Sequence, residues 1–170
     1  TIAIMGDEGS GKTTLLKVLS GCYTTYTGNF LVNNISINNY QLESLRKKIG
    51  FYLSHQEIFT GTVWENISMG REDITTERIV AVAAKVGFDE FLQNLPLGFD
   101  TAIDNNGKRL PNSIAKKILL LRALCHDPYL LILEDPCQGL ENNNKIAFNN
   151  YLLSKPNNAT VIVSTNDIAF

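Results

Sequence analysis

The sequence opens on Thr1-Ile2-Ala3-Ile4-Met5-Gly6-Asp7-Glu8-Gly9-Ser10-Gly11-Lys12-Thr13-Thr14, an apolar run that leads into a glycine-rich segment. Its spacing satisfies the pattern G-x-x-x-x-G-K-[ST], in which backbone N–H groups surround a polyphosphate. The lysine of this pattern reaches the β- and γ-phosphates, and its hydroxyl residue binds Mg²⁺. A glycine-rich turn that binds nothing is the alternative interpretation. The residues predicted to hold the phosphates are Gly6, Gly9, Ser10, Gly11, Lys12, Thr13 and Thr14, with Thr13 also predicted to bind the metal.

Length and composition indicate one globular unit, since 170 residues with 44% hydrophobic content are enough for a core. The net charge of −2 gives no electrostatic reason to expect nucleic acid as a partner. Three cysteines without metal-ligand spacing are interpreted as reduced thiols. The chain begins with Thr1 inside a predicted strand, so we expect it to be a piece of a longer polypeptide.

Apolar β-branched runs alternate with helical patterns along the chain, which predicts an α/β fold with a parallel sheet. The glycine-rich phosphate-binding segment is called the P-loop below. We expect the core lobe that carries it to comprise residues 1–53 and 127–170, with residues 54–126 inserted as a helical lobe. The predicted strands are 1–5, 49–53, 129–133 and 159–164, and a hairpin is predicted over 29–37 around Asn33-Asn34. The predicted helices are 12–21, 42–48, 77–86, 89–95, 113–124 and 141–153.

Five segments follow the phosphate-binding loop in a fixed order: Thr27–Phe30, Ser44–Phe51, Phe59–Ile67, Leu95–Thr101 and Leu121–Leu124. In these segments, and over its whole length, the chain resembles the nucleotide-binding domain of ABC transporters, in particular of exporters. The resemblance implies that strands preceding the P-loop in this family, with the aromatic residue that stacks on adenine, are missing here. It also implies ATP and Mg²⁺ as ligands, a second nucleotide-binding domain and a transmembrane domain as partners, and a place at the cytoplasmic face of a membrane.

This chain departs from the family at the residues that serve hydrolysis. Ser54 stands where a glutamine is expected to contact Mg²⁺ and the attacking water, and Gln56 is two residues too late. The strand 129–133 is expected to lead into Asp then Glu, but here Glu134 precedes Asp135. The resemblance gives Glu134 to the metal and Asp135 to the water, while Asn166 replaces the switch histidine. We therefore take Asp135, Glu134, Asn166 and Ser54 as the candidate catalytic residues.

The resemblance implies a signature L-S-G-G-Q that grips the γ-phosphate of the ATP bound to the partner domain. Here that segment is replaced by Leu110-Pro111-Asn112-Ser113-Ile114. Pro111 removes a hydroxyl and an N–H, and two side chains occupy the glycine positions. The leading hypothesis is therefore an ATP-binding domain of an exporter with weak hydrolysis. A fully hydrolysing transport ATPase and a soluble ABC-like regulatory module are the alternatives. We expect the block Phe59–Ile67 to dock on the membrane domain, with Trp64 either its anchor or part of the core.

Overall fold

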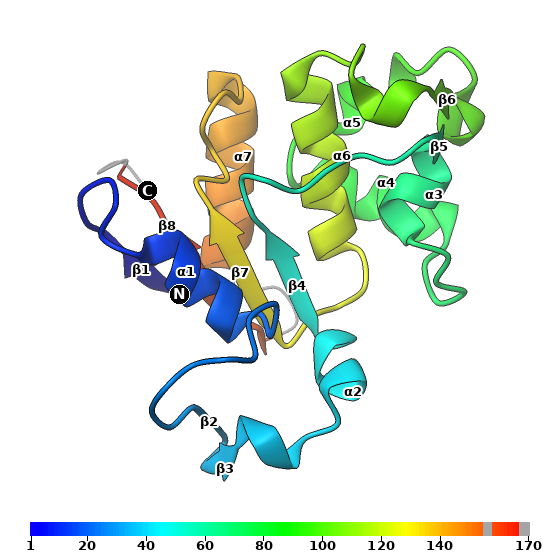
Figure 1. Ribbon diagram of the computed structural model, residues 1–170. Coiled ribbons are helices and arrows are strands. Elements are labelled where there is room, and N and C mark those ends of the chain that lie inside the picture. The colour runs from blue at the N-terminus through cyan, green and yellow to red at the C-terminus, as the bar shows by residue number, and fades with distance from the viewer. Residues whose placement is uncertain (155–157, 167–170) are drawn as a thin grey trace.

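A four-stranded parallel sheet runs through the middle of the molecule in the order β1-β8-β7-β4 (Figure 1). The computed structural model describes residues 1–154 and 158–166. Because all four strands run in the same direction, their carboxyl ends meet at one edge of the sheet, where parallel α/β sheets bind ligands. The strands are β1 (Ile2–Ile4), β4 (Ile49–Tyr52), β7 (Leu130–Glu134) and β8 (Thr160–Ser164).

The sheet separates two parts of the core, because successive side chains of a strand such as β7 point to opposite faces. Ile132 packs with Leu16 of α1 (Lys12–Leu19) on one face. Leu131 and Leu133 belong to a larger cluster on the other face, with Phe148 of α7 (Asn142–Leu153). Helices therefore cover the sheet from both sides, as expected for a parallel sheet of apolar strands.

Strand β1 is formed by the apolar run at residues 1–5 and pairs with β8 alone among the described strands. The sequence predicts a strand buried on both faces, whereas Ile2 is 53% exposed and Met5 is 56% exposed. These exposed fractions are those of this chain by itself.

The hairpin predicted around Asn33-Asn34 is present as β2 (Leu31–Val32) and β3 (Ile35–Ser36), which pair antiparallel. The two asparagines have φ values of 51° and 64°, the left-handed conformation that a two-residue hairpin turn requires. A 3-10 helix η1 (Ile37–Asn39) and helix α2 (Leu42–Arg46) lead from the hairpin into β4.

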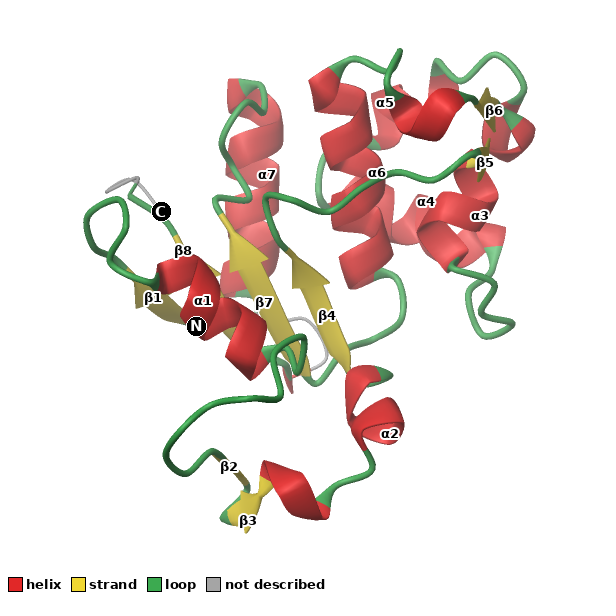
Figure 2. Cartoon of the chain, viewed as in Figure 1, coloured by secondary structure: helices red, strands yellow, loops and turns green. Residues whose placement is uncertain are grey.

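The segment between β4 and β7 is mainly helical and lies to one side of the sheet (Figure 2). Helix α6 connects it to the sheet, because the helix lies against both β4 and α3. The short pair β5 and β6, which the sequence did not predict, closes the far end of this segment. Its elements are β5 (Gly61–Thr62), α3 (Val63–Ser68), α4 (Thr76–Lys85), α5 (Asp89–Gln93), η2 (Gly98–Asp100), β6 (Ala102–Ile103), η3 (Asn105–Gly107) and α6 (Asn112–Leu124).

The α/β fold class predicted from the sequence is confirmed, and most predicted elements are shifted at their ends by a few residues. Helix α1, for example, ends at Leu19, and the chain turns at Gly21 with φ 72°. Within the described residues no helix is long and apolar enough to cross a membrane.

Candidate nucleotide-binding site

The glycine-rich loop joins the end of β1 to the start of α1, at the carboxyl edge of the sheet. Gly9 and Gly11 have φ values of 79° and 90°, a region that residues with a side chain rarely adopt. A Cβ on either glycine would meet nothing within 4 Å, so the backbone conformation and not crowding requires glycine here. Asp7 and Glu8 are exposed, so their carboxylates do not fill the loop.

The loop presents an anion-binding surface. Gly11 precedes α1 and, having no side chain, makes no cap hydrogen bond to the N–H groups of the first turn. Lys12 Nζ donates to the carbonyls of Gly6 at 2.6 Å and Asp7 at 2.9 Å, which holds its charge over the loop. The ring of the loop is completed by the 3.2 Å bond from Ser10 N to Asp7 O, and Thr14 is exposed beside it. These residues fit a polyphosphate.

Three segments far apart in the sequence meet at the Glu134 carboxylate, at the end of β7. Thr13 Oγ1, from the first turn of α1, donates to Glu134 Oε1. Ser54, just beyond β4, donates to Glu134 Oε2 twice, from its backbone N–H at 2.8 Å and from its hydroxyl at 2.7 Å. The structure therefore brings together three of the residues predicted from the sequence, Thr13, Ser54 and Glu134.

Glu134 is a buried carboxylate that is kept charged. Burial acts to raise its pKa, but hydrogen bonds from the Ser54 N–H, Thr13 and the Ser54 hydroxyl, with His55 nearby, lower the pKa below the ordinary value. A charged carboxylate beside a hydroxyl offers the hard oxygen ligands that Mg²⁺ prefers. No group of three or more His, Cys, Asp and Glu able to hold a metal occurs within residues 1–154 and 158–166. A magnesium ion here would thus depend on phosphate oxygens as well, as is common for Mg²⁺.

Asp135 follows in a left-handed conformation with φ 42°. Its backbone is held on both sides, because its N–H donates to Ser164 O at 2.8 Å and its carbonyl accepts from Lys116 Nζ at 2.8 Å. Lys116 also donates to Gln138 O, so this lysine of α6 fixes the turn that carries Asp135. The sequence pattern did not predict this contact, because it joins two segments that are 19 positions apart.

Asn166 is exposed, two residues beyond β8. The register pairs Ser164 with Glu134, so Asn166 follows the strand that lies directly beside the one carrying the carboxylates. Thr165 N donates to Ile4 O and thereby fixes the chain just before Asn166. The asparagine is thus at the same edge of the sheet as the loop.

The replaced signature segment lies apart from this loop. Figure 1 shows the start of α6 across the molecule from the loop between β1 and α1. The structure has Pro111 at the N-cap position of α6 with no side-chain cap hydrogen bond, and Asn112 and Ser113 are the first two residues of the helix. All three side chains are exposed. The segment therefore adds nothing to the phosphate loop of its own chain.

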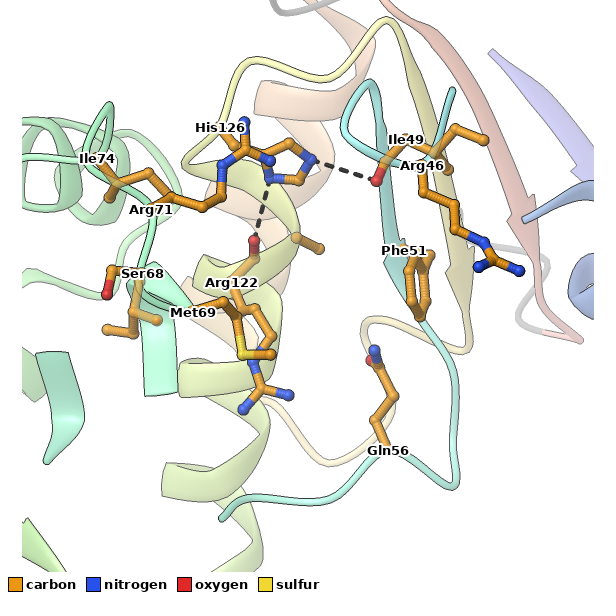
Figure 3. A pocket seen from close by; sticks show the side chains of 12 residues that line it. Arg46, Ile49, Phe51, Gln56, Ser68, Met69, Arg71, Ile74, Arg122 and His126 are labelled. Carbon is orange, nitrogen blue, oxygen red and sulfur yellow. Dashed lines mark hydrogen bonds between the residues drawn. The ribbon is translucent and has the colours of Figure 1, made fainter. Parts of the chain in front are cut away.

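Gln56, two residues beyond Ser54, is used locally. Its side-chain oxygen accepts from Leu53 N at 3.2 Å, within its own turn. The residue also lines a pocket between β4, α3 and α6 (Figure 3). In that pocket His126 lies between the carbonyls of Ile49 and Arg122, at 3.3 Å from each.

Arg122 lies in α6 among buried apolar residues, and its side chain is largely removed from solvent. It donates to both oxygens of Asn66, at 2.7 and 3.1 Å, and to Glu57 O at 3.2 Å. Burial lowers its pKa to about 10. The side chain therefore ties α6 to the start of the α3 region, a role that periodicity alone does not reveal.

A family model described as ABC transporter matches residues 1–138 of this chain. The chain belongs to the ABC transporter family. It is 36% identical over 141 residues to a multidrug efflux ATP-binding/permease protein of Mycobacterium bovis, which covers 83% of the chain and 12% of that protein. It is 33% identical over 167 residues to ABC transporter B family member 29 of Arabidopsis thaliana, which covers 96% of the chain and 26% of that protein.

The fold agrees with this family. A bacterial Atm1-family ABC exporter with ATP bound matches with a TM-score of 0.89 at 23% identity, over 99% of the chain and 29% of that exporter. The predicted resemblance to an ATP-binding domain of exporter type is confirmed, and an ABC domain of this kind binds nucleotide. The chain spans about an eighth to a quarter of the length of the relatives named above.

Proposed function

We propose that this chain binds Mg·ATP in the loop between β1 and α1 and serves as the ATP-binding domain of an exporter. The observation that carries the proposal is the loop itself, with Gly9 and Gly11 in left-handed conformations and Lys12 Nζ held over it. Gly6, Ser10 and Thr14 complete the phosphate-binding set, and the first turn of α1 directs its N–H groups at the same anion.

The same site is proposed to take Mg²⁺ through the Thr13 hydroxyl and the Glu134 carboxylate, which are in contact. The bound metal would supply charge neutralisation for the phosphates. Asp135 is proposed to act as the catalytic base, at the position where the family has a glutamate. Its side chain is one methylene shorter than the glutamate of the family, and a misplacement near 1 Å costs about 10²-fold in rate.

We propose that hydrolysis by this domain is weak. Ser54 is committed to Glu134, Asn166 cannot carry a proton at neutral pH, and Pro111 offers no N–H to a partner's phosphate. In this reading a second nucleotide-binding domain completes each site, and ATP changes how the two domains pair. The lobe that binds nucleotide would comprise residues 1–53 and 127–170. The lobe of residues 54–126 would change its contacts with the partner domains when ATP binds.

The experiment is a thermal unfolding measurement on the complete protein with and without Mg·ATP. Nucleotide at about 100 times Kd should stabilise the domain by roughly 2.7 kcal/mol. Lys12→Ala should remove most of this gain, whereas Lys17→Ala, in the last turn of the same helix, should keep it. A wild-type protein that shows no shift with Mg·ATP contradicts the proposal.

The partner proposed for residues 54–126 is a transmembrane domain of the same exporter, at the cytoplasmic face of the membrane. Trp64 is half-buried, meets Phe99 edge-on at 6.3 Å between ring centres, and lines a surface groove with it. The neighbouring pocket of Figure 3 is lined by Arg46, Arg71 and Arg122, and Arg71 is paired with the Asp73 carboxylate. Arg46 and Arg122 donate to backbone carbonyls instead of a carboxylate.

Crosslinking in the complete protein tests this docking surface. A crosslinker placed on the block Phe59–Ile67 should capture the membrane domain, and one placed at exposed Leu153, at the end of α7, should not. Equal capture from both places, or none from the block, contradicts the proposed surface.

A further inference from the structure

The carboxylate of Glu134 joins two segments that each border the nucleotide site. One oxygen accepts from Thr13 in the first turn of α1, and the other accepts twice from Ser54 beyond β4. Glu134 is only 6% exposed, so these contacts are largely shielded from water. Charge-assisted hydrogen bonds of this kind are among the stronger contacts that a protein makes.

The position of Glu134 in the sheet explains how it reaches both partners. It is the last residue of β7, which has β4 as one neighbour and β8 as the other. Its side chain has the same parity as Ile132, which packs against Leu16 of α1. The carboxylate therefore stands on the α1 face of the sheet, between the end of β4 and the start of α1.

Two departures from the family pattern meet in this contact, and they are opposite in length. Glutamate at position 134 is one methylene longer than the expected aspartate, and serine at position 54 is several atoms shorter than the expected glutamine. The short Ser54 side chain does not extend far into the site. The longer Glu134 side chain extends far enough for its carboxylate to contact the Ser54 hydroxyl. The two substitutions are therefore complementary in length, and the Ser54 hydroxyl is already bonded.

We propose that Ser54 is a positioning residue that acts through Glu134, and that their direct contact ties residues 53–58 to the nucleotide site without a metal ion. The family's glutamine at this place contacts the metal, so its tie depends on bound Mg²⁺. Here the tie uses protein atoms alone. The contact keeps residues 53–58 anchored whether or not nucleotide is bound. The functional meaning of this anchoring rests on the proposed function.

The test is amide hydrogen exchange of the peptide covering residues 53–58, in the complete protein, in EDTA and without nucleotide. The Ser54 N–H should be protected in the wild type, because it donates to Glu134. Glu134→Asp, which shortens the carboxylate, should speed exchange there by about tenfold or more. Ser54→Ala removes the hydroxyl bond alone and should have a smaller effect in the same direction. Glu72→Asp, the same change at an exposed site, should have none.

A paired variant separates this positioning role from a general structural one. Ser54→Gln with Glu134→Asp restores both lengths expected in the family, so protection of residues 53–58 should then require Mg·ATP. In the wild type, adding Mg·ATP should change exchange in this peptide by less than about twofold.

Three results would overturn the proposal. They are equal exchange of wild type and Glu134→Asp in EDTA, wild-type protection that appears only with Mg·ATP, or a paired variant whose protection is the same with and without the metal. The wild-type comparison uses no variant, so poor folding of a variant does not spoil it. A protein that fails to bind ATP at all would refute the proposed function, and the EDTA measurement would still decide the contact.

Discussion

Helices α1 and α6 begin in opposite ways, although both starts correspond to places where ABC domains hold phosphate. Helix α1 follows Gly11, with φ 90°, and α6 follows Pro111, with φ −55°. Neither start has a side-chain cap hydrogen bond. At α1 a glycine backbone leaves the first N–H groups open to close approach, whereas at α6 side chains stand at the corresponding places and Pro111 has no N–H to give.

The body of α6 is buried while its start is exposed. Residues from Ile118 to Leu124 are almost all buried, and Arg122 ties the helix to Asn66. Packing therefore holds α6 in place without any requirement on Pro111. The comparison teaches that a helix start can lose its ligand chemistry at little structural cost when the rest of the helix is anchored in the core.

The largest expected effect is on hydrolysis. Phosphate release by the complete protein should lie well below the ~10 s⁻¹ typical of a competent enzyme. Replacing Pro111→Ser, Asn112→Gly and Ser113→Gly together with Asp135→Glu should raise turnover by about 10² or more, because we propose that the restored groups contact the transition state. The measurement is Mg²⁺-dependent phosphate release, alone and with the partner domain.

Adding Lys12→Ala to the restored variant is the control, and it should return phosphate release to background. Wild-type turnover near ~10 s⁻¹ would show that Asp135 and its neighbours are adequate, and the contrast between the two helix starts would then carry no functional meaning.

A smaller effect is expected at the start of α1. Gly11→Ala should lower nucleotide affinity by about tenfold, since a non-glycine residue in this conformation costs roughly 1–2 kcal/mol and the free loop would relax away from it. Gly98→Ala is the matched control, because Gly98 also has a positive φ, 56°, but lies in η2. Calorimetry on both variants checks this. Equal losses of affinity would mean that the α1 start has no special role.

The smallest effect concerns the far end of α6, where His126 follows the helix. Burial lowers its pKa, with Arg71 acting in the same direction, while the Ile49 and Arg122 carbonyls and Asp73 oppose this. The unfolded chain therefore binds a proton at higher pH than the folded one, and the free energy of unfolding should fall as pH drops below the ordinary histidine pKa of about 6.5.

His126→Gln should flatten this part of the pH profile, measured by denaturant unfolding between about pH 7.5 and pH 5.5. The decline should stop below the lowered pKa of the folded state. If His126→Gln keeps the full decline in the free energy of unfolding, another group causes it. The end of α6 would then be insensitive to protonation.

The sequence by itself determined the phosphate loop and the fold class. The spacing of Gly6, Gly11, Lys12 and Thr13 is local, so it specifies the turn and the helix start that follows. The apolar runs specify strands and the alternation specifies a parallel sheet, because burial of each element depends on its own residues. The strand order β1-β8-β7-β4 could not be predicted, since it depends on which strands lie beside one another.

Tertiary structure alone decided the contacts that complete the site. Glu134 meets Thr13 across 121 positions of sequence and Ser54 across 80, and the strand order β1-β8-β7-β4 is what brings them to one edge. The sequence treats the replacements at 54 and 134 as two separate losses. Their complementary lengths emerge only when the strands are placed side by side, because a side chain's reach has meaning only against a neighbour whose distance the fold sets.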